Sequence, residues 1–129
     1  MKKRSLALFA LMLVVFLTAC GTKDETAQIT APVQAFYEAI VSQNRDRIGT
    51  IACGEWEKEA LRDVDSFMGV KSELKDFSCA VENIQGDTAS VKCTGSIAAS
   101  YGAEVTEFPL ERRSHKVVKG QGDWRICGY

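Results

Sequence analysis

Apolar residues recur at helical spacing in the first half of the chain. The positions i, i+3, i+4 and i+7 of one segment are apolar and would share one helix face; they are Val33, Phe36, Tyr37 and Ile40. Thr30 is placed to cap this helix, and Pro32 is tolerated in its first turn because no amide donor is needed there. The sequence therefore predicts a first helix that buries one side.

Two further helices are predicted after a polar break at Asn44. The second is short and would bury Ile48, Ile51 and Ala52. The third runs from Glu55 to Met68, where these apolar residues recur at helical spacing: Trp56, Ala60, Val64, Phe67 and Met68. Acidic residues crowd its first turn, which favours the helix dipole, and Gly69 stands where a helix commonly stops.

From about Leu74 the period changes to two, which is typical of strands. A turn at Gly86-Asp87 separates the first strand from a second with one apolar or small face, formed by Ala89, Val91, Cys93, Gly95 and Ile97. The later elements are a turn at Gly102, a third strand from about Val105 to Val118, and a last strand carrying Trp124 and Ile126. Pro109 and the polar stretch 112–116 interrupt the third strand. A bulge or an edge position there would be consistent with the proline. Helices followed by a meander of about four strands predict an α+β fold with the helices on one face of an antiparallel sheet.

The beginning of the chain has the layout of a signal peptide. Basic residues at positions 2–4 precede an unbroken apolar run of twelve residues, Leu6 to Leu17. This run is shorter than the roughly 20 residues that a membrane-spanning helix needs. The following Leu17-Thr18-Ala19-Cys20 resembles the bacterial lipobox, which implies a lipoprotein signal peptide of residues 1–19 and diacylglycerol on Cys20.

Lipidation of Cys20 would hold the chain on the extracytoplasmic side of a membrane. Two or more acyl chains anchor a protein stably, at about 0.8 kcal/mol for each buried methylene. Gly21 rather than Asp follows the cysteine. In a bacterium with two membranes, this resembles lipoproteins that are sorted to the outer membrane. The anchoring membrane is either the cell membrane or the outer membrane. Residues 20–30 are expected to be a polar tether to a single domain of residues 31–129.

Charge excludes one class of partner. Removal of the signal peptide would leave thirteen basic and seventeen acidic residues, a formal charge of −4, so nucleic acid is not expected as a partner. Basic residues gather late in the sequence, at Arg112, Arg113, Lys116, Lys119 and Arg125. We interpret them as the solvated face of the sheet rather than as a patch for anionic lipid headgroups or an acidic partner.

Two segments resemble the NTF2-like, cystatin-like domains of bacterial lipoproteins. Residues 31–40, followed by a polar break and a short helix ending in Cys53, resemble the start of these domains, and residues 122–127 resemble their last strand. The resemblance implies helices packed on a curved antiparallel sheet, often with a conical pocket between the first helix and the sheet. Relatives such as ketosteroid isomerases and polyketide cyclases place acids, tyrosines or histidines in that pocket, but no catalytic motif of theirs can be carried onto this chain.

Four cysteines follow Cys20, and an exported chain meets conditions in which thiols pair. Four cysteines allow three connectivities. If the first two strands pair with Val81 opposite Val91, the disulfides would be Cys79–Cys93 and Cys53–Cys127, and the family resemblance suggests the same second pair. Metal binding is the alternative, but no Cys-x-x-Cys spacing occurs and the chain has one histidine, so no metal site is expected.

Three residues are candidates for a pocket: Tyr37, Trp56 and His115. Tyr37 lies on the buried helix face, where such a ring usually belongs to the core with its hydroxyl at the rim. His115 is the one side chain with an ordinary pKa near neutrality, but its polar neighbours favour a solvated strand face. We therefore expect no catalytic residue and no cofactor.

Three classes of function remain. A non-catalytic module that binds a small ligand or an envelope protein is the first choice, because the fold suits it and no reactive group of residues is evident. A structural or accessory component of an envelope complex would have a filled cavity and an exposed apolar patch. An enzyme of the isomerase or cyclase type would need an acid–base pair in the pocket.

Intact-protein mass spectrometry of the membrane fraction is expected to show a chain cleaved before Cys20 and carrying diacylglycerol. Thiol alkylation should modify four further cysteines only after reduction, because all four would be paired. An unlipidated chain with free thiols would contradict both the anchor and the disulfides.

Overall fold

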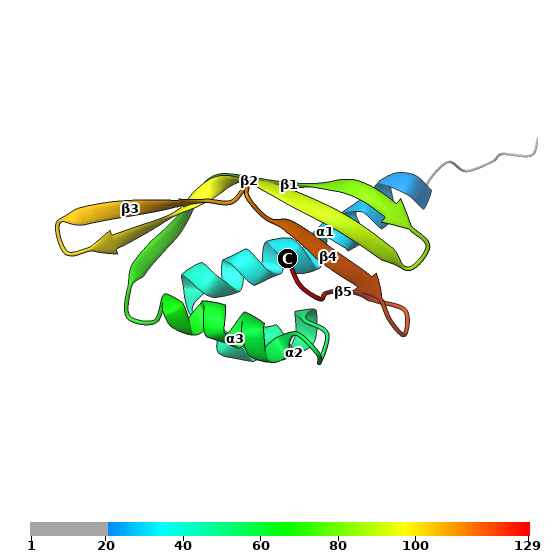
Figure 1. Ribbon diagram of the computed structural model, residues 1–129, viewed down its shortest axis with the longest axis horizontal. Coiled ribbons are helices and arrows are strands. Elements are labelled where there is room, and N and C mark those ends of the chain that lie inside the picture. Colours follow the sequence, from blue (N-terminus) through cyan, green and yellow to red (C-terminus); the bar gives the residue numbers. More distant parts are fainter. Residues whose placement is uncertain (1–20) are drawn as a thin grey trace, which may run out of the picture.

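The computed structural model describes residues 21–129, in which helices precede strands as the sequence predicts. Figure 1 shows the helices grouped beneath one face of a curled sheet. The helices are α1 (Gly21–Ser42), the 3-10 helix η1 (Arg45–Arg47), α2 (Ile48–Ile51) and α3 (Glu57–Ser66). The strands are β1 (Lys71–Gln85), β2 (Thr88–Tyr101), β3 (Glu104–Pro109), β4 (Ser114–Lys119) and β5 (Trp124–Ile126). All strand pairs are antiparallel, so the predicted α+β class is confirmed, with five strands in one sheet.

Two predictions fall outside the described residues: the signal peptide, residues 1–19, and the lipidation site Cys20. Within residues 21–129, no helix combines the length and the apolar character needed to cross a bilayer.

The segment predicted to be a tether, residues 20–30, is helical from Gly21 onward. The prediction was wrong because a polar segment can continue a helix toward its amino terminus when later residues of that helix pack against the core. Ile29 is fully buried one turn before Val33, so the core already holds the helix at this point. Thr30 is consequently inside the helix rather than at its cap, and its hydroxyl donates to carbonyl oxygens three and four residues earlier, both at 3.2 Å.

The third helix is shorter than predicted at both ends. Trp56 and Phe67 are the cap residues of α3. Val64 is fully buried, as its position in the apolar stripe predicts. Met68 belongs to the same stripe but is 50% exposed, because the chain has left the helix and turns at Gly69, where φ is +76°.

The pairing of β1 with β2 is interrupted by a bulge at Gly95. Lys75 pairs with Ser96 and Ser78 with Thr94, so two residues of β1 lie opposite Gly95 alone. Gly95 has φ +94°, and a Cβ there would lie 2.3 Å from the carbonyl oxygen of Lys75. Only glycine fits this crossing. The sheet that contains β1 and β2 is curled, as the ribbon in Figure 1 shows.

The third strand predicted from Val105 to Val118 is in fact two strands. β4 pairs with the first half of β2 and β3 pairs with the second half, on either side of the bulge. Residues 110–113 connect them, and the N–H of Leu110 donates to the carbonyl oxygen of Gly95 at 3.0 Å. Pro109 ends β3, in agreement with the interruption that the sequence predicts.

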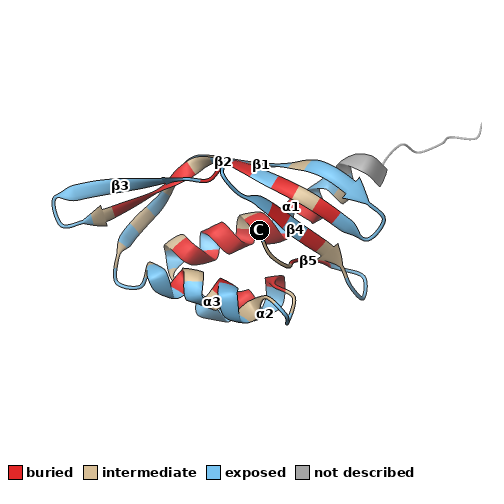
Figure 2. Cartoon of the chain, in the orientation of Figure 1, coloured by how far each residue is buried: buried red, intermediate tan, exposed pale blue. Residues whose placement is uncertain are grey.

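The core lies between α1 and the concave face of the sheet. Its fully buried side chains include Ile29, Val33, Phe36, Ile48, Val64, Val91, Val117 and Ile126. Figure 2 shows buried residues along α1 and on the central strands, whereas β3 is exposed throughout. The alternation predicted for β2 holds as far as Cys93. Beyond the bulge, Ser96 and Ala98 are buried together with Ile97.

Two disulfides join distant parts of this core. β1 and β2 pair with Val81 opposite Val91, the register on which the expected disulfide depended, so Cys79 lies directly opposite Cys93, and these two residues are bonded. Cys53, after α2, is bonded to Cys127, after β5. The sequence separations are 14 and 74. On the chain-entropy estimate such loops contribute about 3 and about 4.5 kcal/mol to stability.

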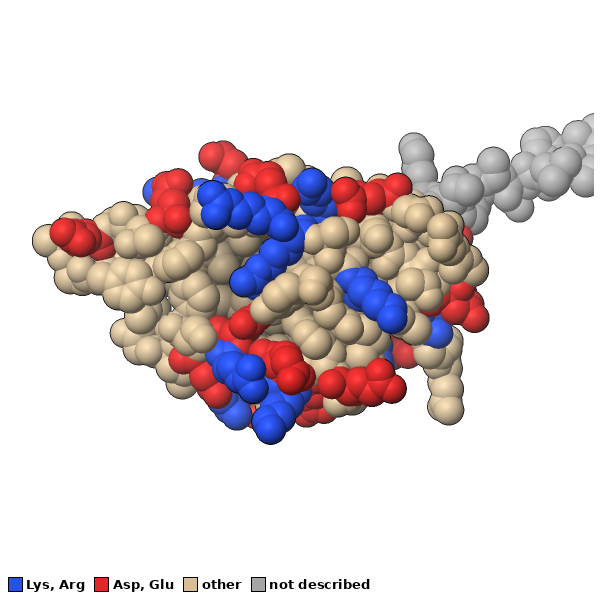
Figure 3. Space-filling model, in the orientation of Figure 1, with Lys and Arg blue, Asp and Glu red and all other residues tan. Residues whose placement is uncertain are grey.

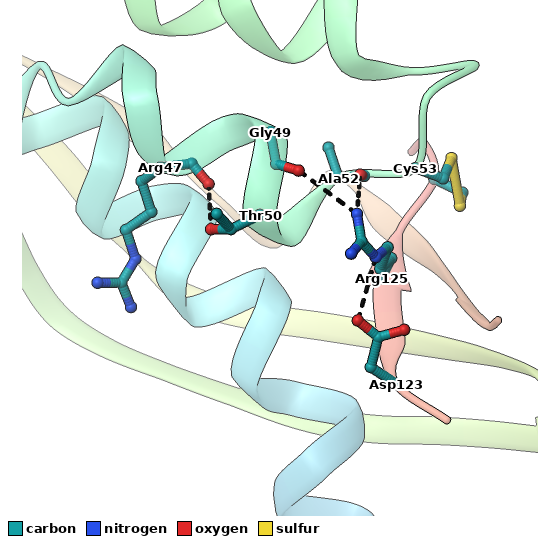
Figure 4. A network of polar contacts seen from close by, with 8 residues as sticks. Arg47, Gly49, Thr50, Ala52, Cys53, Asp123 and Arg125 are labelled. Carbon is teal, nitrogen blue, oxygen red and sulfur yellow. Dashed lines mark hydrogen bonds and ion pairs between the residues drawn. A yellow bond between two sulfur atoms is a disulfide. The ribbon is translucent and has the colours of Figure 1, made fainter. Parts of the chain in front are cut away.

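Polar contacts also tie the last strand to α2, as Figure 4 shows. The guanidinium of Arg125 donates to the carbonyl oxygens of Gly49 and Ala52, both at 3.4 Å, and to the carboxylate of Asp123 at 3.2 Å. A cation at the carboxyl end of a helix complements the helix dipole. The N–H of Cys53 donates to the carbonyl oxygen of β5 residue Ile126 at 3.0 Å. These contacts fix where the chain leaves β5.

Substitution of Gly95 by Ala is expected to lower the free energy of unfolding by about 3 kcal/mol or more, because the new Cβ meets backbone atoms and the φ angle is strained. Gly102→Ala is the matched control, since φ is +66° there but no atom lies within 4 Å of the added Cβ. Its expected loss is about 1–2 kcal/mol. Urea unfolding measures both losses, and equal values would refute the steric explanation.

Candidate functional site

A cavity of about 530 Å³ lies between α1, the end of α3 and the second half of β2. Its apolar lining consists of Ile40, Phe67, Ile97, Phe108, Pro109 and Leu110. Its polar lining consists of Tyr37, Asp63, Ser66, Tyr101, Arg112 and Arg113. The bend at Gly95 directs the β2–β3 hairpin over the end of α3, where the ring centroids of Phe67 and Phe108 are 5.6 Å apart. The cavity is therefore a product of the bulge.

Tyr37 of α1 lines the cavity, and its hydroxyl is hydrogen bonded to Nε2 of His115 on β4 at 2.8 Å. Both residues are buried, with exposed fractions of 2% for Tyr37 and 0% for His115. The expectation that His115 lies on a solvated strand face was wrong. β4 alternates, so that His115 and Val117 are buried while Ser114 and Lys116 are exposed. The polar neighbours of His115 in the sequence thus belong to the opposite face of the strand.

Burial sets the protonation states of this pair. It raises the pKa of Tyr37 to about 12 and lowers the pKa of His115 to about 4, because each charged form loses its hydration. The positive charge of Arg113 further lowers the pKa of His115. Nδ1 of His115 has no hydrogen-bond partner in the part of the chain that the structure describes. At pH 7 both side chains are neutral, and neither pKa lies near the value that suits proton transfer at that pH.

Asp63, Arg113 and Tyr129 form a linked group at one side of the cavity. The hydroxyl of Tyr129 donates to the carboxylate of Asp63 at 2.9 Å, and the guanidinium of Arg113 lies 3.8 Å from the same carboxylate. The guanidinium carbon is also 4.0 Å from the centroid of the Tyr129 ring. Backbone hydrogen bonds of residues 127–128 to Lys116, at 2.8 and 2.9 Å, hold the last residues beside β4 and so position Tyr129.

Of the three candidate pocket residues, Tyr37 lines the cavity, whereas Trp56 and His115 are not among the residues that line it. The ring of Trp56 packs between Phe36 and Tyr129, at centroid distances of 5.1 and 5.5 Å. His115 packs against Tyr37 on one side and Tyr129 on the other, at 5.3 and 5.8 Å. The structure thus brings all three candidates into one aromatic cluster.

Most of the cavity lining was not predicted from the sequence. Arg112 and Arg113 were interpreted as part of a solvated surface. One feature of the sequence could have indicated part of the lining. Phe108 and Leu110 are apolar residues that flank a proline within a polar stretch. Their place over α3 depends on the non-local pairing of β3 with β2, for which the local pattern holds no information.

No protein-family model and no curated protein matches the chain. Solved structures do share its fold. An uncharacterized protein with a cystatin-like fold from Caulobacter vibrioides is 18% identical, with 78% of this chain and 84% of that chain covered and a TM-score of 0.52. A proposed dehydratase of the NTF2-like family from Streptomyces avermitilis is 15% identical, with 84% of this chain and 97% of that chain covered and a TM-score of 0.51. The predicted NTF2-like, cystatin-like fold is therefore confirmed, and at this identity the likeness concerns the fold alone.

His115 is expected to stay neutral in the folded protein down to about pH 4. Because the chain has one histidine, an NMR titration of its ring protons gives a single curve. The histidine of the unfolded chain takes up a proton near its ordinary pKa of 6.5, whereas that of the folded protein does so only near pH 4. The contribution of this difference to the free energy of unfolding is complete above pH 6.5 and is lost as the pH falls toward 4. The expected loss is about 2 kcal/mol at pH 5.

His115→Gln is expected to remove this part of the pH dependence, whatever its effect on stability at pH 7. A midpoint near 6.5 in the folded wild-type protein would contradict the burial of the ring.

Proposed function

We propose that this chain is an extracytoplasmic lipoprotein, anchored through Cys20, whose NTF2-like domain binds a small ligand in its cavity without changing it chemically. The observation that carries the proposal is the cavity of about 530 Å³ with a mixed apolar and polar lining. This volume falls within the range of roughly 300–1,000 Å³ that is typical of ligand pockets.

The cavity favours ligand binding over a structural or accessory role in an envelope complex. A structural role would be served by a filled interior and an apolar patch for a partner. Tyr101 and Phe108 are 46% and 39% exposed, but both line the cavity, so their exposure is that of an open pocket mouth. Val105, which is 59% exposed nearby, is the one large apolar residue of this hairpin outside the lining.

The polar groups of the cavity favour binding over catalysis. The carboxylate of Asp63 is engaged by Tyr129 and Arg113, and the pKa values of about 12 for Tyr37 and about 4 for His115 are far from neutrality. General acid–base catalysis is most effective when the pKa of the group is near the working pH. These groups are therefore suited to orienting a ligand by hydrogen bonds.

An acid–base enzyme is the second candidate, and one observation favours it. Tyr37 lines the cavity, is hydrogen bonded to His115 and shares the lining with Asp63, so the elements of a proton relay are close together. The proposed dehydratase from Streptomyces avermitilis shows that one protein with this fold has been considered an enzyme. Chemical change of a bound compound that is lost in Tyr37→Phe would support this candidate instead.

The disulfides favour the extracytoplasmic location. Cys53–Cys127 and Cys79–Cys93 use all four cysteines of the described residues, and such bonds persist mainly in oxidising compartments. The lipobox-like sequence before Cys20 supports anchoring through that residue.

Binding is tested with residues 21–129, which contain the whole described core and both disulfides. The probe is N-phenyl-1-naphthylamine, an uncharged dye that fluoresces in apolar surroundings. One saturable site is expected. Ser66→Trp should weaken binding tenfold or more, because Ser66 lines the cavity mouth and is itself exposed, so the new ring enters the cavity without disturbing the core.

Ser78→Trp is the matched control, since Ser78 is an exposed serine of β1 outside the cavity lining, and it should bind the dye like the wild type. No saturable binding, or equal binding by both variants, would contradict the proposed function.

A further inference from the structure

The two arginines of the cavity differ in their surroundings. A guanidinium nitrogen of Arg113 lies 3.8 Å from the carboxylate of Asp63, and the guanidinium carbon lies 4.0 Å from the centroid of the Tyr129 ring. Arg112 lines the same cavity and makes no salt bridge or side-chain hydrogen bond with any residue between 21 and 129. A guanidinium presents five donors in a planar fork that suits carboxylate and phosphate groups. The cavity therefore offers one unpaired cation to a ligand.

The acidic residue of the lining does not offset this charge. The carboxylate of Asp63 already accepts a hydrogen bond from Tyr129 at 2.9 Å and faces Arg113. The charges of Asp63 and Arg113 balance each other, so Arg112 leaves the lining with a net positive charge. In Figure 3, basic side chains reach the hollow below the sheet, while acidic side chains border it on the side of α3.

The rest of the lining suits an apolar body of limited size. The rings of Phe67 and Phe108 close one end, and Ile40, Ile97 and Leu110 supply aliphatic walls. One water molecule occupies about 30 Å³ of liquid, so the cavity corresponds to about 18 water molecules. A single alkyl chain or a small ring system fits this space, whereas a lipid with two long chains does not.

We propose that the cavity binds a single-chain anionic amphiphile, with its carboxylate or phosphate paired to Arg112 at the mouth and its apolar body between Phe67, Phe108 and Ile97. This inference rests on the proposed binding function and adds the class of ligand. Tyr37, whose hydroxyl is hydrogen bonded to His115, adds a polar residue to the α1 wall of the cavity.

Photolabelling of the full chain in phosphatidylcholine nanodiscs tests the inference. Three probes carry the same diazirine-bearing twelve-carbon chain and end in a carboxylate, a phosphate or a neutral alcohol. Mass spectrometry locates the label, with the probe content of the bilayer matched between samples. The two anionic probes should label the cavity segments 63–68 and 97–110 about fivefold more than the alcohol does, as one partly exposed ion pair would give. A preference for the carboxylate would indicate a free fatty acid, and a preference for the phosphate would indicate a phosphate monoester.

Arg112→Gln should reduce labelling by the anionic probes about fivefold and leave labelling by the alcohol unchanged. Arg62→Gln is the matched control, because Arg62 is an exposed arginine of α3 outside the cavity lining, and it should label like the wild type. Equal labelling by all three probes, or labelling unaffected by Arg112→Gln, would overturn the inference and leave a binding cavity without a preference for anions. No label in the cavity from any probe would instead contradict the proposed binding function.

Discussion

The backbone of β2 passes so close to β1 at Gly95 that no side chain fits between them, and much of the molecule follows from this crossing. A Cβ would meet the carbonyl oxygens of Lys75 and Asp76 at 2.3 and 2.6 Å. The crossing divides β2 into two halves, and the strand that would otherwise pair along its whole length becomes β3 and β4. The second half of β2 keeps Ile97 in the core and extends with β3 toward the end of α3, where the ring centroids of Phe108 and Phe67 are 5.6 Å apart. The cavity lies between this hairpin, α1 and α3, so a backbone constraint rather than a set of polar residues creates the site.

The other side of the site depends on the end of the chain. The contacts of Arg125 with α2 and the disulfide from Cys53 fix residue 127, and the backbone bonds to β4 then bring Tyr129 over His115. Tyr129 in turn engages Asp63 and Arg113. A covalent bond between segments 74 residues apart thus helps to hold the tyrosine that contacts Asp63 and Arg113.

The sequence predicted the fold better than it predicted the site. Periodicity placed Val33, Phe36 and Ile40 on one buried face and predicted the alternating faces of β2 as far as Cys93, because both features depend on local alternation. It failed at residues 21–30, where a polar segment continues a helix that the core holds only from Ile29, and at His115, where the neighbours in sequence lie on the opposite face. It also gave no account of Arg112 or Phe108 as cavity residues, because their positions follow from how β2 bends and which strand pairs with each half. Local pattern determines faces, whereas the cavity depends on non-local geometry.

An open cavity leaves apolar surface uncovered, and the domain must gain stability elsewhere. Tyr101 and Phe108 remain 46% and 39% exposed, so a small domain forgoes part of the burial that stabilises a filled core. The two disulfides act mainly on the unfolded chain, by about 3 and about 4.5 kcal/mol, and therefore stabilise the fold without filling the cavity. One lies across β1 and β2 on the Cys93 side of the bulge and one joins the end of α2 to the end of β5, while the β2–β3 hairpin carries none. The cross-links thus secure the core, while the hairpin that covers the cavity is held by pairing with β1, by its own pairing and by the contact of Phe108 with Phe67.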